Sequence, residues 1–168
     1  MELDESFVKK KIHIYTDGSS KGNPGPGGYG VFIEIFFGRF YNRKIISEGF
    51  RYTTNNRMEL LSVIVGLEKI ENKKQNIIVF TDSKYIVNTV QNRWIYKWKK
   101  NNFHNKKNVD LWKRFLDSFC KHFVKFYWIK SHNYHYVNDY CDRLSVESSK
   151  RKNLKIDYVY EKQRNYLT

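Results

Sequence analysis

An apolar stretch that stops on an aspartate and then breaks into glycine and proline constrains this chain more than any other feature. Residues 11–17 read KIHIYTD, an alternating, β-branched pattern that is typical of a strand. The next residues, GSSKGNPGPGGYG, hold most of the glycines and both prolines of the chain. Because glycine adopts backbone conformations that are closed to other residues, the chain can turn away at once. Asp17 is therefore expected to end a strand, with its carboxylate at the end of a sheet.

The remaining sequence alternates between strand and helix patterns. Further strands are expected over 28–37, 43–53, 76–83 and 124–132. Helices are expected over 55–72, 84–92 and 138–150. The segment 94–123 is expected to form a helix, a basic loop and a second helix. The first three strands suggest an antiparallel meander with a turn near Gly38. This order of elements predicts a mixed α/β sheet.

Two local expectations concern helix ends and cysteines. The helix expected over 55–72 carries one apolar stripe, and either Asn55 or Asn56 is expected to cap its N-terminus. Cys120 is expected to face the core and Cys141 to lie in a helix. Two cysteines make no disulfide framework, which favours a reducing, cytoplasmic setting.

The charge of the chain indicates its partner class. Lysine and arginine total 31 against 17 acidic residues, a net charge of +14. A surplus of this size favours a polyanion, and nucleic acid is the usual one, although solubility or a lysine-rich composition would also produce it. No apolar run approaches 18 residues and the N-terminus lacks the apolar core of a signal peptide, so no membrane association is expected.

Three further acidic residues, like Asp17, are expected near the end of a strand or the start of a helix. Asp82 closes the strand VFTD, Glu59 is placed in the first turn of an apolar helix, and Asp142 is placed in the first turns of the last helix. Taken singly, each acid is more often a turn former, a cap or a partner of the helix dipole. Taken together, they gather where open α/β sheets place their sites, beyond the carboxyl ends of strands.

Four carboxylates in one place require compensation. At an effective dielectric constant near 20, each close pair repels by roughly 4 kcal/mol, so the acids must be protonated or must surround cations. Two Mg²⁺ ions would balance four negative charges, and hard cations prefer oxygen ligands. Two such ions can activate a water and stabilise a leaving oxygen, which is the equipment for phosphodiester hydrolysis.

Four ordered motifs carry a resemblance to a known family. They are YTDGSSKGNPGPGGYG, TTNNRMELLSVIVGL, VFTDSKYIVN and WIKSHNYHYVNDYCDRLS, and over about residues 10–148 the chain resembles ribonuclease H, type 1. The resemblance implies a five-stranded mixed sheet, three antiparallel strands followed by two parallel ones, flanked by helices and bearing a basic helical handle. It also implies cleavage of the RNA strand of RNA/DNA hybrids, leaving 5′-phosphate and 3′-hydroxyl ends.

The resemblance assigns the catalytic groups residue by residue. The ligands of two Mg²⁺ ions, with Mn²⁺ as an alternative metal, fall on Asp17, Glu59, Asp82 and Asp142. The mobile catalytic histidine of the family falls on His132, with a role in proton movement or product release. Read from the residues alone, a histidine in this position is more often an exposed loop residue.

The resemblance also implies how a hybrid is held. Minor-groove contacts fall on Asn23, Asn55 and Asn56, and a phosphate pocket for the DNA strand falls on Thr54 and Asn108. The arginine of that pocket falls on Tyr52, so the pocket is either weakened or reached by Arg51 through a bulge. The remaining expected phosphate and handle contacts are Lys84, Trp94, Lys99, Lys100, Lys106 and Lys107. Trp98 and Trp112 are expected to be core residues between two helices.

The expected organisation is a flexible N-terminus at 1–10, a catalytic domain at 11–150 and a basic C-terminal tail at 151–168 whose structure the pattern leaves open. A monomer is the default expectation, with an RNA/DNA hybrid as its partner.

Two alternatives to this function remain. One is a non-catalytic hybrid-binding protein; the other is a different nuclease-fold enzyme such as a resolvase, an integrase or an exonuclease. An exonuclease would carry an acid two residues after Asp17, where Ser19 stands.

Overall fold

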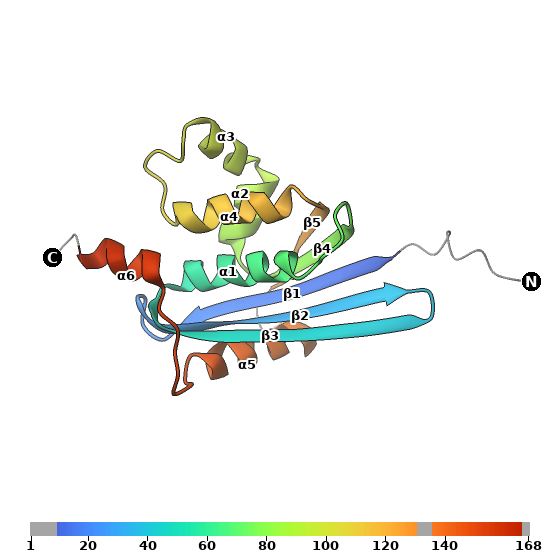
Figure 1. Cartoon of the computed structure of the whole chain (residues 1–168), viewed down its shortest axis with the longest axis horizontal. Coiled ribbons are helices and arrows are strands. Elements are labelled where there is room, and N and C mark those ends of the chain that lie inside the picture. The colour runs from blue at the N-terminus through green and yellow to red at the C-terminus, as the bar shows by residue number, and fades with distance from the viewer. Residues whose placement is uncertain (1–9, 131–135, 166–168) are drawn as a thin grey trace, which may run out of the picture.

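In the computed structural model, which describes residues 10–130 and 136–165, the strands form one mixed sheet in the order β3-β2-β1-β4-β5 (Figure 1). The strands are β1 Lys11–Ser20, β2 Gly25–Phe37, β3 Phe40–Thr53, β4 Asn76–Thr81 and β5 Phe123–Trp128. The first three pair antiparallel, whereas β1 with β4 and β4 with β5 pair parallel. The expected fold class is therefore confirmed.

The helices cover both faces of the sheet. They are α1 Asn55–Glu68, α2 Lys84–Gln91, α3 Trp94–Lys100, α4 Val109–Phe119, α5 Tyr136–Ser148 and α6 Tyr158–Asn165. Figure 1 shows α1 and α2 to α4 on one face, α5 on the other, and α6 beside the start of α1. Within the described part of the chain, no helix is long and apolar enough to cross a membrane.

The end of β1 differs from the expectation in an instructive way. Asp17 does not end the strand, because β1 pairs with β2 as far as Ser20 opposite Gly27. Its pairing with β4 stops earlier, at Tyr15 opposite Phe80, so Asp17 lies beyond the parallel part of the sheet. Gly18 serves close packing, since a Cβ on it would lie 2.2 Å from the backbone of Met58 and Glu59 in α1.

Helix α1 is the centre of the core. Leu60, Val63, Ile64 and Leu67 are fully buried, as predicted. Burial is not confined to one stripe, however, because every residue from Arg57 to Leu67 is buried and α1 ends at Glu68. The cap was predicted wrongly: Thr54 is the N-cap, its hydroxyl accepting from the Arg57 amide at 3.4 Å. Thr54 takes this place because its backbone is still extended, whereas Asn55 is already helical.

Helices α2, α3 and α4 form the handle region. Trp112 is fully buried, which confirms its expected core role, and it packs edge-on against Trp98 at 5.5 Å between ring centroids. Trp98 is only partly buried and lies at the edge of the core. The expectation for Cys120 was wrong, because α4 ends at Phe119 and the cysteine that follows it is exposed. Cys141 is buried in α5, as expected.

Candidate functional site

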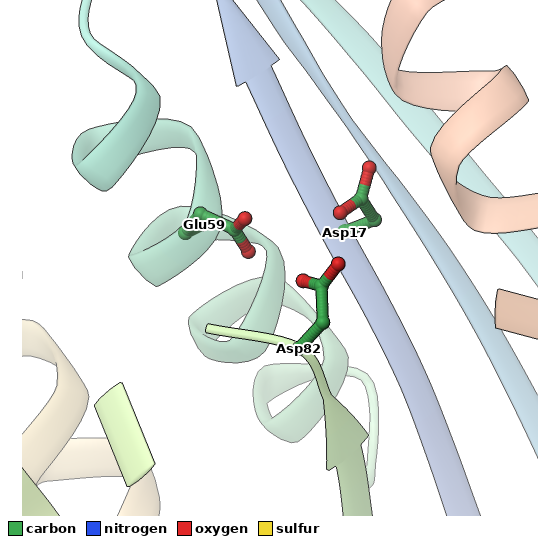
Figure 2. Close-up of side chains that lie close together, drawn as sticks. All are labelled: Asp17, Glu59 and Asp82. Atoms are coloured by element: carbon green, nitrogen blue, oxygen red, sulfur yellow. The ribbon is translucent and has the colours of Figure 1, made fainter. Parts of the chain in front are cut away.

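Three of the four predicted carboxylates meet at the end of the sheet. Asp17 comes from β1, Glu59 from α1 and Asp82 from the residue after β4, and Figure 2 shows the three side chains pointing toward one another. One oxygen of each lies within 4.8 Å of those of the other two. Asp17 and Glu59 are only 5% and 6% exposed.

The fold brings these acids together through two neighbouring strands and one helix. Because β4 runs parallel to β1 beside it, Asp82 emerges at the same edge of the sheet as Asp17. The absence of a side chain at Gly18 lets α1 approach β1 closely enough for Glu59 to join them. Glu59 lies in the second turn of α1, whose first turn contains no acid, so the expected first-turn placement was wrong. Stabilisation of the helix dipole therefore does not explain this residue.

The electrostatics of the cluster are unfavourable without a counter-ion. Burial, followed by the charge of Asp82, raises the pKa of Asp17 to about 7. Burial and the neighbouring Asp17 and Asp82 raise the pKa of Glu59 well above its ordinary value. One carboxylate oxygen of Glu59, Oε2, is buried without a hydrogen-bond partner in the structure. A buried oxygen of this kind is a suitable ligand for a cation.

Asp142 lies close to the cluster but outside the group of three. Its charge contributes to raising the pKa values of both Asp17 and Glu59. It lies in the second turn of α5, which begins at Tyr136, in agreement with the expected placement in the first turns of a helix, although α6 follows this helix. One turn further along α5, the Ser145 hydroxyl donates to Asp17 Oδ2 at 2.9 Å, a contact that sequence reasoning missed. His132 lies outside the described residues.

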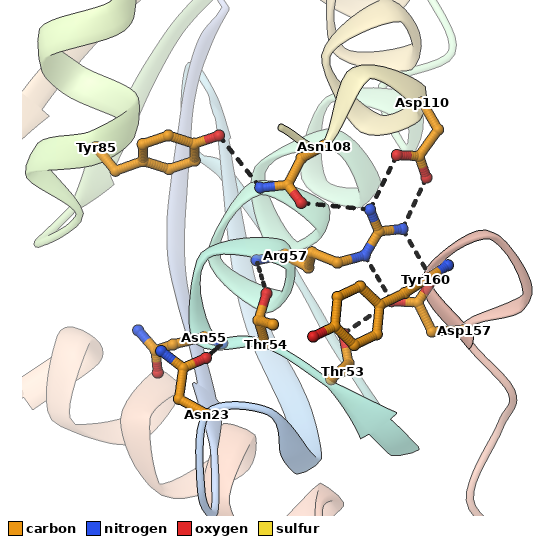
Figure 3. Close-up of polar contacts among 10 residues, drawn as sticks. All are labelled: Asn23, Thr53, Thr54, Asn55, Arg57, Tyr85, Asn108, Asp110, Asp157 and Tyr160. Atoms are coloured by element: carbon orange, nitrogen blue, oxygen red, sulfur yellow. Dashed lines mark hydrogen bonds and ion pairs between the residues drawn. The ribbon is translucent and has the colours of Figure 1, made fainter. Parts of the chain in front are cut away.

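Five of the predicted substrate-contacting residues lie around the start of α1, namely Asn23, Thr54, Asn55, Asn56 and Asn108. The Asn23 side-chain oxygen accepts from the Asn55 backbone amide at 3.1 Å, which ties the loop after β1 to this helix (Figure 3). Asn23, Thr54, Asn56 and Asn108 line one open pocket of about 530 Å³. The pocket is also lined by residues that sequence reasoning did not place there, namely Pro24, Lys106, Lys107, Val109, Tyr160 and Gln163.

A buried arginine stands behind this pocket. Arg57 is 2% exposed and forms ion pairs with Asp157 and Asp110, both at 2.7 Å (Figure 3). Its Nη1 group also donates to Asn108 Oδ1 at 3.5 Å. Sequence reasoning missed all three charged residues, although an arginine inside an apolar helix was a signal that a buried partner must exist.

The question raised by Tyr52 has a structural answer. A register shift between β2 and β3 does lie opposite Arg51 and Tyr52. Arg51 nevertheless does not line the pocket, because it makes a two-pronged ion pair with Glu161 in α6. Tyr52 packs against Tyr160, with 5.8 Å between the ring centroids. An aromatic pair thus occupies the place that the resemblance gives to an arginine.

The other predicted contacts are dispersed around these two sites. Lys84 follows Asp82 by two residues, and its ammonium lies 4.9 Å from the ring centre of Trp128, whose indole N–H donates to the Asp82 backbone carbonyl oxygen. Lys99 and Lys100 are exposed in the last turn of α3, and Trp94 at its start is 42% exposed. Lys106 lies over the Trp98 ring at 5.1 Å. Lys106 also lines the pocket at the start of α1, so the basic handle extends to that pocket.

Comparisons with known proteins agree with this architecture. The family model described as RNase H matches residues 9–150. A curated protein named Ribonuclease H from Rippkaea orientalis is 47% identical over 90% of this chain and 93% of its own length. A second, also named Ribonuclease H, from Desulforamulus reducens, is 47% identical over 94% of this chain and 99% of its own length.

Solved structures show the same likeness. LC9-RNase H1, a type 1 RNase H with the type 2 active-site motif, superposes with a TM-score of 0.74 at 29% identity, over 86% of this chain and 74% of its own. LC11-RNase H1, solved in complex with an RNA/DNA hybrid, superposes with a TM-score of 0.56 at 25% identity, over 82% of this chain and 95% of its own.

Proposed function

The chain belongs to the ribonuclease H family and is a nuclease, and from this premise we propose that it cuts the RNA strand of RNA/DNA hybrids with divalent cations held at the carboxylate cluster. The observation that carries the proposal is the meeting of Asp17, Glu59 and Asp82 within 4.8 Å. Buried like charges at this distance repel strongly, and bound cations would relieve this repulsion while leaving the acids ionised.

The donor set fits Mg²⁺. All the side chains offer oxygen, which hard cations prefer, and the unpartnered Glu59 Oε2 supplies a ligand atom that costs no existing hydrogen bond. We propose Asp17, Glu59, Asp82 and the nearby Asp142 as the ligands of two ions, with Mn²⁺ as a substitute. When bound, the ions would supply an activated water and would neutralise charge on the leaving oxygen.

The residues of the chain would then orient the reaction. Hydrolysis adds water across the bond between phosphorus and the 3′-oxygen, so one fragment ends in a 5′-phosphate and the other in a 3′-hydroxyl. Ser145 holds one oxygen of Asp17, which fixes the direction of this carboxylate. Lys84, at the start of α2 two residues after Asp82, is suited to a phosphate of the strand that is cut.

The surface around α1 is suited to reading the hybrid. Asn23, Asn55 and Asn56 offer donors and acceptors for base edges and 2′-hydroxyls in the minor groove. Thr54 and Asn108 would hold a phosphate of the DNA strand, and Trp94, Lys99 and Lys100 of the handle would follow its backbone. The support for this assignment is the pocket that Asn23, Thr54, Asn56 and Asn108 share.

A cleavage assay tests the proposal. An end-labelled RNA/DNA hybrid should be cut in Mg²⁺ and left intact in EDTA, and RNA/RNA and DNA/DNA duplexes of the same sequence should not be cut. Mapping of the fragments should find 5′-phosphate and 3′-hydroxyl ends. Tight hybrid binding without cleavage in Mg²⁺ or Mn²⁺ would favour the non-catalytic alternative.

His132 is proposed to move the proton at the cutting step or to help release the product. His132→Ala should therefore lower kcat by roughly 10²-fold or more, the usual contribution of a general acid or base, while leaving KM nearly unchanged. Rates measured over a pH series are the check. If wild type and variant have superimposable pH profiles and equal kcat, His132 has no catalytic role.

The organisation and setting of the enzyme remain predictions. We propose that residues 11–150 form the catalytic domain, which the family match over 9–150 supports, and that 151–168 form an appended tail. A monomer is expected by sedimentation at micromolar concentration, and fractionation of the source cells should recover the protein with the cytoplasm.

A further inference from the structure

The pocket at the start of α1 has a wall that the family match does not include. Tyr160 and Gln163 of α6 line it, and both lie beyond residue 150, where the match ends. Lys106 and Lys107, from the loop before α4, line the same pocket. The tail therefore contributes to a cavity whose other residues belong to the matched domain.

Three separate contacts hold α6 in this place. The backbone of Lys155 bonds to Gly49 and Arg51 of β3, adding a short parallel bridge to the sheet. Asp157 accepts from the buried Arg57 and, at 2.8 Å, from the Thr53 hydroxyl. At the next turn, Glu161 pairs with Arg51. Contacts before and within α6 therefore fix both its position and its orientation.

These contacts direct one side of α6 to the pocket. The Tyr160 ring packs against Tyr52, and the Arg57 guanidinium lies 5.7 Å from its centre. Figure 3 shows the Tyr160 hydroxyl directed toward the side on which Thr54 lies, rather than toward Asp157. The neighbouring Tyr158, in contrast, is 73% exposed and does not line the pocket.

The chemistry of the pocket suits a phosphodiester backbone. Among the described residues that line it there is no acid, whereas Lys106 and Lys107 provide two cations. The remaining polar lining consists of amides and hydroxyls, which hydrogen-bond to phosphate and sugar oxygens without reading sequence. Asp110 and Asp157 lie behind the pocket and are both paired with Arg57, which limits their repulsion of an anion.

We propose that α6 is part of the substrate-binding surface, with Tyr160 and Gln163 contacting the sugar–phosphate backbone of the uncut DNA strand. This inference rests on the proposed function, which places the RNA strand at the carboxylates. Thr54 precedes Glu59 by five residues, about 7.5 Å along a helix axis, so the pocket takes a different phosphate from the one that is cut. The tail supplies polar groups where Tyr52 replaces the arginine of the family pattern.

Binding measurements in EDTA test this role separately from catalysis. Tyr160→Phe keeps the ring that packs on Tyr52, and Gln163→Ala alters an exposed side chain, so both variants should fold. The Kd for the hybrid should rise by about threefold for each and about tenfold for the double variant, as expected for lost hydrogen bonds. Tyr158→Phe, on the same helix, is the matched control and should bind like wild type.

A second measurement locates the contact. Hybrids that carry a single uncharged phosphate analogue at successive positions of the DNA strand should identify one position that weakens wild-type binding. At that position the penalty should shrink in the Tyr160→Phe/Gln163→Ala variant and in Lys106→Ala/Lys107→Ala, while the penalties elsewhere stay as in wild type. Analogues in the RNA strand should show no such coupling.

The outcomes separate the two proposals. Wild-type Kd values for Tyr160→Phe and Gln163→Ala, or equal penalties at every analogue position, would overturn the role of α6 even if the enzyme cuts hybrids normally. Position-specific coupling in a protein that never cuts the RNA strand would overturn the proposed catalysis and leave this contact in place.

Discussion

Two acidic residues of this protein are buried where their ionised forms are unfavourable. Asp17 and Glu59 are buried beside each other and beside Asp82, and burial raises the pKa of both. Ser145 offers one hydrogen bond to Asp17, which offsets part of this penalty. In their ionised form, the side chains that would hold the cations thus destabilise the metal-free protein, which leads to two predictions.

Replacing Asp17 should separate cutting from binding. Asp17→Asn keeps the shape of the side chain and removes a charged ligand, so cleavage of the hybrid should fall below detection. Binding of the hybrid in Mg²⁺-free buffer should persist, because the lysines and asparagines of the binding surface are untouched. Filter binding and single-turnover cleavage are the measurements, and near-normal turnover would exclude Asp17 as a metal ligand.

The same substitution should stabilise the protein without metal. The pKa of Asp17 rises from 3.8 to about 7 on folding, so its contribution to stability is present at low pH and is lost as the pH rises through this window. In EDTA at neutral pH, Asp17→Asn should therefore gain up to about 4 kcal/mol over wild type. Thermal unfolding at about pH 4 and pH 8, with and without Mg²⁺, is the check.

Two features of that experiment make it decisive. The advantage of the variant should be small at about pH 4, where Asp17 is protonated in the folded state and only about half ionised in the unfolded state. Added Mg²⁺ should raise the Tm of wild type more than that of the variant. A Tm difference that is independent of both pH and Mg²⁺ would contradict the electrostatic account.

Among the elements, α1 and the handle show which structural features a local sequence pattern predicts and which it does not. The stripe of Leu60, Val63 and Ile64 predicted α1 correctly, because a 3.6-residue period is a local property. The N-cap was missed by one residue, because which side chain caps depends on the backbone angles of Thr54. The basic loop between α3 and α4 was likewise predicted, whereas its approach to α6 at the pocket was not.

The handle should act on binding rather than on chemistry. Replacing Lys99, Lys100, Lys106 and Lys107 by alanine removes four cations that can release counter-ions from the hybrid. KM should rise several-fold at moderate salt, kcat should change little, and the slope of log Kd against log salt should fall by up to about 3.6, or about 0.9 for each lysine that contacts a phosphate. Titrations from low to moderate NaCl measure this slope, and a slope equal to that of wild type would remove the handle from the binding surface.

At the level of the whole molecule, one buried arginine joins three distant parts of the chain. Arg57 of α1 binds Asp110 of α4 and Asp157 of the tail, and thereby fixes the handle and α6 relative to the core. The burial of Arg57 is tolerable only because both partners are present. The pocket between the handle and the tail therefore depends on this arrangement.

Removing one partner of Arg57 should be costly. Asp157→Ala leaves a buried guanidinium short of a counter-ion and should lower the free energy of unfolding by about 3 kcal/mol, with loss of the α6 contacts. Glu161→Ala is the control, because its pair with the exposed Arg51 contributes little. Urea unfolding of the two variants is the measurement, and equal stabilities would show that the buried pair does not anchor the tail.

The composition, the element order and the four acidic motifs were readable in the amino-acid order, because charge, periodicity and residue spacing are local properties. Folding was needed to bring Asp17, Glu59 and Asp82 within 4.8 Å and to leave Asp142 beside them rather than among them. It was also needed to pair Arg57 with Asp157 and to set Tyr160 into the pocket, contacts that span about a hundred residues. Such contacts depend on how the packed elements face one another, and no local pattern encodes that.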